Sequence, residues 1–385
     1  MAATTCTIQN AEDRSKGSND NYSEDNLPEF TPMPWTMSEI RSAIPAHLFV
    51  RHTWTGIAYL VRDIVMAALM WNVALHLDPI FKSPPVVERM TYLGVETARW
   101  IAWTVYWWFQ GLAFTGIWVI GHECGHGAFS DSKIVCDVIG FVSPRLSIDI
   151  CRIHDFARMV RLSIRSCGLR TSAGRSPTTG TTWNHASMER DEVYVPKTRS
   201  DLGIPLESEH GIDYDEYFGD TPIYTLFMLV RQQVLAFPAY LLFNVSGQKN
   251  YPKWTNHFDP NSILFRKHQR NAVIISNFGI ITMCYLVQRA CAIWGAAEVI
   301  KYYGIPWLCV SHWFIMITYL HHTDPELPHY RNPQWNFQRG AAATVDRNFL
   351  GWMGRFFLHD VAHFHVVHHF FPKMPFYQDL MRRGT

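Results

Sequence analysis

One stretch of the chain, residues 100–120, holds WIAWTVYWWFQGLAFTGIWVI and carries no charged side chain. A helix that crosses a membrane needs about 20 consecutive, mostly apolar residues. Residues 56–77, 272–287 and 305–320 are further apolar segments, and 15 Trp contribute to an aromatic content of 14%. So many apolar segments are hard to place in one soluble core. The sequence therefore predicts an all-α integral membrane protein with about four transmembrane helices.

A fifth apolar segment, residues 222–243, differs from the others because polar residues interrupt its centre. These residues are Arg231, Gln232 and Gln233. An ionised Arg at the middle of a bilayer costs about 3 kcal/mol or more. We therefore predict that this segment lies at the membrane interface or is half-buried, and does not span.

The charges along the chain predict its topology. Arg and Lys crowd residues 121–271 and 321–385, whereas residues 78–99 and 288–304 carry few. The positive-inside rule then places the crowded stretches and both termini in the cytosol. Residues 1–35 are polar, lack an apolar signal region and are expected to form a disordered tail. The net charge of +1 gives no indication of a nucleic-acid partner.

Histidines form two clusters with helical spacing, each on the predicted cytosolic side. His122 and His126 lie in HECGH, and His365, His368 and His369 lie in HVVHH. Residues three or four apart share one face of a helix, so each cluster can direct its imidazoles at one point. Neutral imidazole is a good ligand for iron, zinc or copper. The spacing therefore predicts a metal site in a cytosolic helical cap.

The HECGH motif also matches the HExxH pattern of zinc hydrolases, which is a different class of enzyme. In such an enzyme Glu123 would be the general base and zinc would activate water. The extended motif of the metzincins is absent after His126. A protease would also leave the HVVHH cluster without a role. The pattern therefore disfavours this alternative.

Several motifs resemble one known family. GHECGHGAFS at residues 121–130 and HVVHHFFPKMPFY at residues 365–377 resemble the first and third histidine boxes of the oleate Δ12 acyl-lipid desaturases, in a fungal form. Four further stretches resemble the same family in the same order: residues 38–51, 188–203, 319–330 and 339–348. The resemblance covers residues 33–148 and 187–377, and it implies a desaturase-like membrane domain over residues 36–377.

The resemblance implies a helical stem and a cytosolic cap that holds two iron ions. It adds His322, in the HTDP stretch, to the histidines of the two boxes. His321 is a weaker candidate, because relatives often have Gln there, and His329, His359 and His363 are expected to have supporting or structural roles. The expected metal ligands are His122, His126, His322, His365, His368 and His369.

The activity that the resemblance implies is the insertion of a cis double bond into membrane-lipid acyl chains, of the oleate-to-linoleate type. The co-substrate is O2, and the electrons come from cytochrome b5 and NADH-cytochrome b5 reductase. A hydroxylase or acetylenase relative is an alternative. The expected location is the endoplasmic reticulum membrane, as a multi-pass protein with cytosolic termini.

The chain departs from the family at the second histidine box. Relatives have an HxxHH motif before the MERDEV stretch, but residues 149–186 have none and contain only His154 and His185. We interpret these residues as an aberrant insert, caused by a frameshift or retained intron in the gene or by genuine divergence. Residues 378–385 are expected to be a truncated C-terminal tail. Whether His154, His185 or His321 substitutes as a ligand stays open.

The missing box has a consequence for activity. Six histidines would have to hold two irons, and the three ligands of the second box have no counterpart. We therefore expect that the chain as written does not make linoleate. The alternative to a damaged enzyme is a non-catalytic membrane protein that keeps the desaturase fold.

Overall fold

The computed structural model describes residues 33–147, 184–202, 221–324 and 326–378. The chain divides into two units, Met1–Thr36 and Met37–Thr385, and the second contains all of the helices named below. The predictions for residues 1–32, for His154 and for residues 379–385 concern residues outside the described part of the chain.

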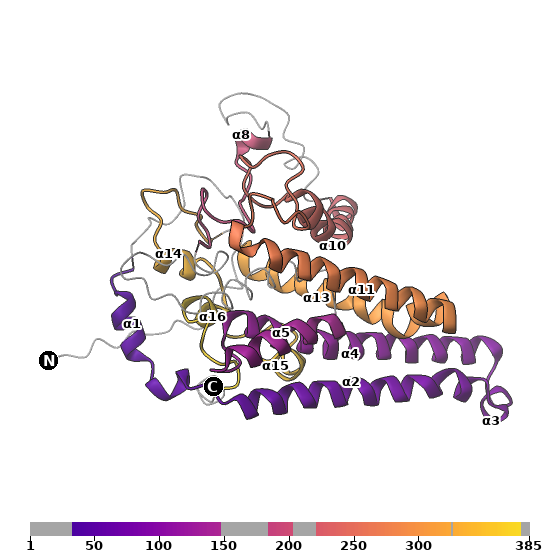
Figure 1. Cartoon of the computed structure of the whole chain (residues 1–385). Coiled ribbons are helices and arrows are strands. Elements are labelled where there is room, and N and C mark those ends of the chain that lie inside the picture. The colour runs from indigo at the N-terminus through magenta and orange to yellow at the C-terminus, as the bar shows by residue number, and fades with distance from the viewer. Residues whose placement is uncertain (1–32, 148–183, 203–220, 325, 379–385) are drawn as a thin grey trace, which may run out of the picture. The chain divides into compact units, whose positions relative to one another are not determined.

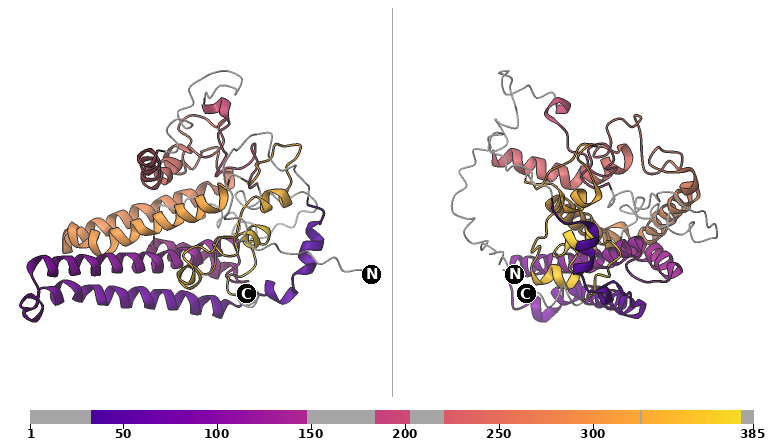
Figure 2. Two further views of the ribbon diagram at one scale, coloured as in Figure 1. Left: turned by 180° about the vertical axis from the view of Figure 1, so that it is seen from behind. Right: turned by 90° about the vertical axis from the view of Figure 1, so that its left-hand side faces the viewer.

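The described part of the second unit is helical, with one isolated bridge between Ser187 and Tyr330. The long helix α4 packs against both α2 and α13, and α11 extends in the same direction (Figures 1 and 2). Short helices, among them α1, α14 and α16, and loops gather at one end of this stem, whereas α3 lies at the other end (Figure 1). The long helices are α2 (Thr53–Phe81), α4 (Tyr92–His126), α10 (Pro222–Phe243), α11 (Arg270–Trp294) and α13 (Ile305–His322). The short ones are α1 (Met37–Ala43), η3 (Ala46–Phe49), α3 (Pro84–Val87), α5 (Lys133–Ser147), α8 (Arg199–Leu202), η5 (Lys267–Gln269), α12 (Ala296–Val299), the π-helical η6 (Ile300–Gly304), α14 (Phe337–Ala342), α15 (Trp352–Phe357) and α16 (His365–Phe370).

Helix α4 contains the uncharged stretch and continues beyond it at both ends. It begins after Thr91, whose side chain accepts a hydrogen bond from the backbone N–H of Gly94. It ends at Gly127, whose φ of 70° is a left-handed conformation that favours glycine at a helix C-terminus. The same helix therefore runs from the apolar stem to His122 and His126 without a break.

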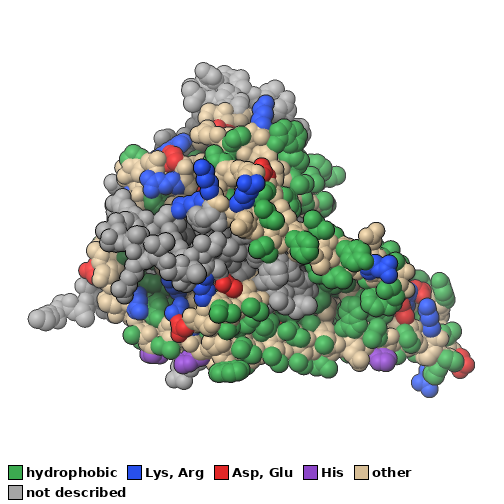
Figure 3. Space-filling view, in the orientation of Figure 1, with side chains coloured by type: hydrophobic (Ala, Val, Ile, Leu, Met, Phe, Trp, Pro, Cys, Tyr) green, Lys and Arg blue, Asp and Glu red, His purple; other side chains and the backbone are tan. Residues whose placement is uncertain are grey.

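Within the described residues, three helices are long and apolar enough to cross a membrane, judged by length and composition: α2, α10 and residues Val273–Trp294 of α11. Hydrophobic side chains cover much of the stem face seen in Figure 3. Exposed apolar residues include Leu69 and Val73 on α2 and Phe278 and Ile281 on α11. The finding supports a helical membrane protein, whereas the count of four spans and the cytosolic cap stay predictions.

Helix α10 is oriented differently from the stem. Figure 1 shows it nearly end-on, and the right-hand view of Figure 2 shows it running across the direction of the stem helices. Gln233 at its centre lies with its Oε1 3.0 Å from Nδ1 of His312 on α13. One of the polar residues that interrupt this segment is thus paired with a neighbouring helix. The interfacial placement of the segment stays a prediction.

The two charged residues in the first apolar segment join the stem to the cap. Asp63 is fully buried, forms an ion pair with Arg62 at 2.7 Å and lies 2.7 Å from Nε2 of His359. Arg62 also donates to the backbone oxygen of Phe356 at 2.9 Å. A charged residue within a membrane segment is expected to have such partners, because an isolated charge there is costly.

Gly116 of α4 allows this junction to pack closely, and its replacement by Ala is expected to destabilise the protein. A Cβ atom there would lie 2.3 Å from the Phe357 oxygen and 3.0 Å from Oδ2 of Asp63. Overpacking of this kind costs about 1–3 kcal/mol. We expect Gly116→Ala to lower the thermal unfolding temperature in detergent. Gly304→Ala is the matched control, because its Cβ would meet only ordinary contacts at 3.7–3.8 Å; an equal loss in both variants would contradict this explanation.

Candidate metal centre

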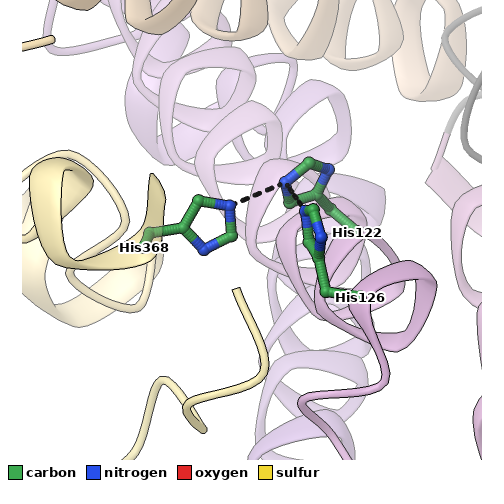
Figure 4. Close-up of side chains that lie close together, drawn as sticks. All are labelled: His122, His126 and His368. Carbon is green, nitrogen blue, oxygen red and sulfur yellow. Dashed lines mark hydrogen bonds between the residues drawn. The ribbon is translucent and has the colours of Figure 1, made fainter. Parts of the chain in front are cut away.

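The first cluster brings together histidines of the two spaced motifs, HECGH and HVVHH. His122 and His126 lie one turn apart on α4, and His368 approaches them from α16 (Figure 4). The Nε2 atoms of His122 and His126 are 3.0 Å apart, and those of His122 and His368 are 3.4 Å apart. We call these three residues the first trio. Their ligand atoms all lie within 4.8 Å of one another.

A second trio forms beside the first and consists of His322, His365 and His369. His322 is the last residue of α13, and the other two lie one turn apart on α16. The Nε2 atom of His365 is 3.0 Å from that of His322 and 3.3 Å from that of His369. Helix α16 therefore contributes to both trios, and the structure brings together all six of the expected ligands in two groups.

The spacing of these nitrogen atoms suits a shared metal ion. Metal–imidazole bonds are about 2.1 Å long, so two such nitrogens at right angles lie about 3.0 Å apart. The closest nitrogen pair in each trio is separated by 3.0 Å. The closest pair of each trio therefore has the separation expected of two ligands of one ion.

Hydrogen bonds at the opposite ring nitrogens orient two of the imidazoles. Nδ1 of His368 lies 3.3 Å from a carboxylate oxygen of Glu123, and Nδ1 of His365 donates to the Val361 oxygen at 3.1 Å. A proton held on Nδ1 leaves Nε2 free to bind a metal, which is the usual arrangement of ligating histidines. Glu123 is 2% exposed, and its carboxylate faces the ring of His368. This placement disfavours a role for Glu123 as the general base of a zinc hydrolase.

Burial keeps these imidazoles in the form that binds metal. It holds the pKa of His365 and of His369 well below its ordinary value, and the neighbouring imidazoles add to this effect. Protonation and metal binding compete for the same nitrogen, so a neutral imidazole is ready to ligate.

The other cap histidines have different partners. Both nitrogens of His321 face backbone oxygens, at 2.6 and 2.9 Å, so neither points to a trio. His359 contacts Asp63, and Nε2 of His363 lies 3.0 Å from the Asn348 side chain. These contacts agree with the structural roles expected for them. His329 belongs to neither trio among the described residues.

His185 is the residue that sequence reasoning undervalued. Its Nε2 lies 3.2 Å from Nδ1 of His322, and its ring centroid is 4.8 Å from that of His369. His185 and Ala186, at the C-terminal end of the segment that we interpreted as an aberrant insert, are buried. Residues 149–183 lie outside the described part. In the sequence, only the position of His185 just before the MERDEV stretch could have indicated a role near the trios. Its spacing from the other histidines gives no such indication.

The fold and the two trios define a helical protein with a histidine-rich, metal-binding type of site beside apolar helices. A family model described as fatty acid desaturase matches residues 207–378, and one described as a domain of unknown function (DUF3474) matches residues 1–70. The chain is similar to the Delta(12) fatty acid desaturase of Mortierella isabellina, at 38% identity over 360 residues, which are 91% of this chain and 79% of the relative. It is also similar to the Delta(12) fatty acid desaturase DES8.11 of Calendula officinalis, at 38% over 91% of this chain and 82% of the relative. A third relative, the oleate hydroxylase FAH12 of Claviceps purpurea, is 34% identical over 90% of this chain and 69% of its own length.

These relatives are similar over most of their length and most of this chain. The chain therefore belongs to the fatty acid desaturase family, and its expected class, an oxidoreductase of lipid metabolism, is confirmed. Its expected resemblance to Δ12 desaturases is confirmed as well. The fungal character and the loss of the second histidine box stay predictions.

Proposed function

We propose that this protein is of the Δ12 type of fatty-acyl desaturase, whose reaction is the introduction of a cis double bond into oleoyl chains of membrane lipids. The chain as written has no HxxHH motif in residues 149–186 and is expected to carry out this reaction only when that box is restored. The observation that carries the proposal is the meeting of both recognised histidine boxes in two trios, with α16 shared between them. The names of the similar proteins support the choice of the Δ12 position.

The residues present fit two iron ions, and each trio would hold one. Bound iron supplies the oxidation chemistry, with O2, that removes hydrogen from unactivated methylene groups. The chain itself orients the ligand rings through Glu123 and Val361 and surrounds them with buried side chains. The Nδ1 contacts direct Nε2 of His368 and Nε2 of His365 at the centres of their trios.

The proposed setting is the endoplasmic reticulum membrane, with the histidine-bearing end of the stem and both termini in the cytosol. One similar protein, from Brassica juncea, is named as an endoplasmic reticulum omega-6 fatty acid desaturase. Electrons would reach the irons from cytochrome b5 and its NADH-dependent reductase. An apolar stem next to the trios suits a substrate that stays in the bilayer.

The proposal is tested by the product made in a yeast that contains oleate but no linoleate. The chain is expressed with a relative's second-box segment in place of residues 149–183, and total fatty acids are analysed by gas chromatography and mass spectrometry. Linoleate, with its new double bond at the Δ12 position, is the expected product. A double bond at another position would contradict the Δ12 assignment.

Two alternatives have their own observations. The oleate hydroxylase among the similar proteins favours hydroxylation, and hydroxylated oleate in the same assay would replace the proposal with that reaction. The absence of an HxxHH motif in residues 149–186 favours a non-catalytic relative. In that case, neither product would form although the repaired chain accumulates in the membrane.

A further inference from the structure

His185 lies between the second trio and a buried carboxylate. Its side chain is buried, with Nε2 placed 2.8 Å from the Ala343 oxygen and 3.2 Å from Nδ1 of His322. On the other side of the ring, Nδ1 lies 3.6 Å from Oδ2 of Asp191. Asp191 is itself only 2% exposed. Among the described residues, the His185 imidazole therefore connects this acid to the second trio through His322.

The backbone around His185 holds the ring in this place. Its carbonyl oxygen accepts a hydrogen bond from Trp335 Nε1 at 3.0 Å. Gly340 packs against the same oxygen so closely that a Cβ atom there would lie 2.3 Å from it. The next residue, Ala186, donates its N–H to Oδ2 of Asp191 at 3.1 Å. Both the backbone and the side chain of His185 are thus fixed by the cap.

The positions of the ring protons on His322 and His185 determine which hydrogen bonds His185 can form. When Nε2 of His322 binds a metal, the single proton of that neutral ring must sit on Nδ1. The described group nearest to this Nδ1 is Nε2 of His185, which can accept the proton's hydrogen bond only if its own proton is on Nδ1. That proton then faces Asp191, and a small shift would close the 3.6 Å gap to hydrogen-bond length. Each ring keeps one proton, but this arrangement gives up the hydrogen bond that Nε2 donates to the Ala343 oxygen at 2.8 Å, so the ring must turn away from that oxygen as Nδ1 closes on Asp191.

We propose that His185 is a positioning residue for the second trio: it accepts a hydrogen bond from metal-bound His322 and donates one to Asp191. The inference rests on the proposed function, because it needs a metal at that trio. His185 acts through His322 and is not itself a ligand, since its Nε2 faces Nδ1 of His322, whereas Nε2 of His322 faces His365.

The first trio gives an independent parallel within the same molecule. There, a buried carboxylate, Glu123, contacts Nδ1 of His368 directly at 3.3 Å. In the second trio the carboxylate of Asp191 does not contact a ligand ring directly. The imidazole of His185 lies between Asp191 and His322. Each trio is thus backed by one buried acid, which raises the basicity of a ligand ring.

The test measures metal binding at the second trio alone, in the full chain purified in detergent. His122→Ala and His126→Ala disable the first trio, and Co2+ is then titrated while its d–d absorption is recorded. Adding His185→Leu is expected to weaken Co2+ binding by about 10–100-fold, whereas His185→Gln, whose amide reaches the position of Nε2 and can accept, is expected to stay within about 3-fold.

A matched control separates positioning from general stability. His257→Leu removes another buried histidine, 1% exposed and packed against Leu241 and Tyr240 away from the trios. It is expected to lower the thermal unfolding temperature of the metal-free protein and to leave the Co2+ affinity unchanged. Equal weakening by His257→Leu and His185→Leu would reduce His185 to a structural residue and overturn the proposal.

Other outcomes are also decisive. Unchanged Co2+ affinity in His185→Leu, or equal weakening in His185→Gln, overturns the hydrogen-bond role. If Co2+-saturated His185→Leu had a different d–d spectrum from the background protein, His185 would be a metal ligand, and the positioning role would be overturned. If the background protein itself binds no Co2+, the metal assignment of the proposed function fails, and the role of His185 fails with it; that failure is visible before any change at His185 is made.

Discussion

His368→Ala is expected to reduce the iron bound at saturation from two ions to one per chain. His368 is the α16 member of the first trio, and its loss leaves only the two α4 histidines to hold that ion. Losing a contact that merely supports a ligand costs about 10–100-fold in metal affinity, so losing a ligand costs at least as much. His365→Ala is expected to remove the other ion in the same way, because His365 is the central residue of the second trio.

Metal analysis by mass spectrometry, combined with Mössbauer spectroscopy of 57Fe-loaded protein, checks this result. The double variant His365→Ala, His368→Ala is expected to bind no iron. His76→Ala is the matched control, since His76 lies on the exposed surface of α2 and belongs to neither trio. An equal loss of iron in the control, or two ions in the double variant, would show that the trios do not hold the metal.

Restoring a second histidine box is expected to change linoleate formation from none to a clear chromatographic peak. The chain as written offers three imidazoles to each ion, and an HxxHH segment would supply three more. The structure sets the boundary of the exchange at residues 149–183, because His185 contacts His322 and Ala186 contacts Asp191. An exchange that runs through residue 186 would remove His185 together with the aberrant insert.

Three controls accompany this experiment in the same oleate-containing yeast. The unmodified chain is expected to yield no linoleate, and so is the repaired chain with Ala in place of the three restored histidines. Adding a relative's C-terminal tail, alone and together with the restored box, measures the effect of such a tail on linoleate formation separately. Linoleate from the unmodified chain would mean that six histidines suffice, and the ligand count behind this prediction would then be wrong.

The sequence by itself determined the class of fold and the identity of five of the six trio residues. The reason is that both signals are local: a helix presents residues three and four apart on one face, and a long apolar run needs lipid or a large core around it. His365, His368 and His369 could therefore be identified from spacing alone, and they do lie on one short helix. His322 was found only through the resemblance, because a single histidine at the end of an apolar segment has no spacing to recognise.

Only the tertiary structure decided how these residues divide between two trios and what surrounds them. Helix α16 sends His368 to one trio and its neighbours to the other, and this division depends on where α4 and α13 end. The contacts of Glu123 and of His185 join residues about 137 to 245 positions apart, which no local pattern encodes. Burial then gives these long-range contacts their chemical effect, because an imidazole or carboxylate away from water depends on the few partners that the fold places beside it.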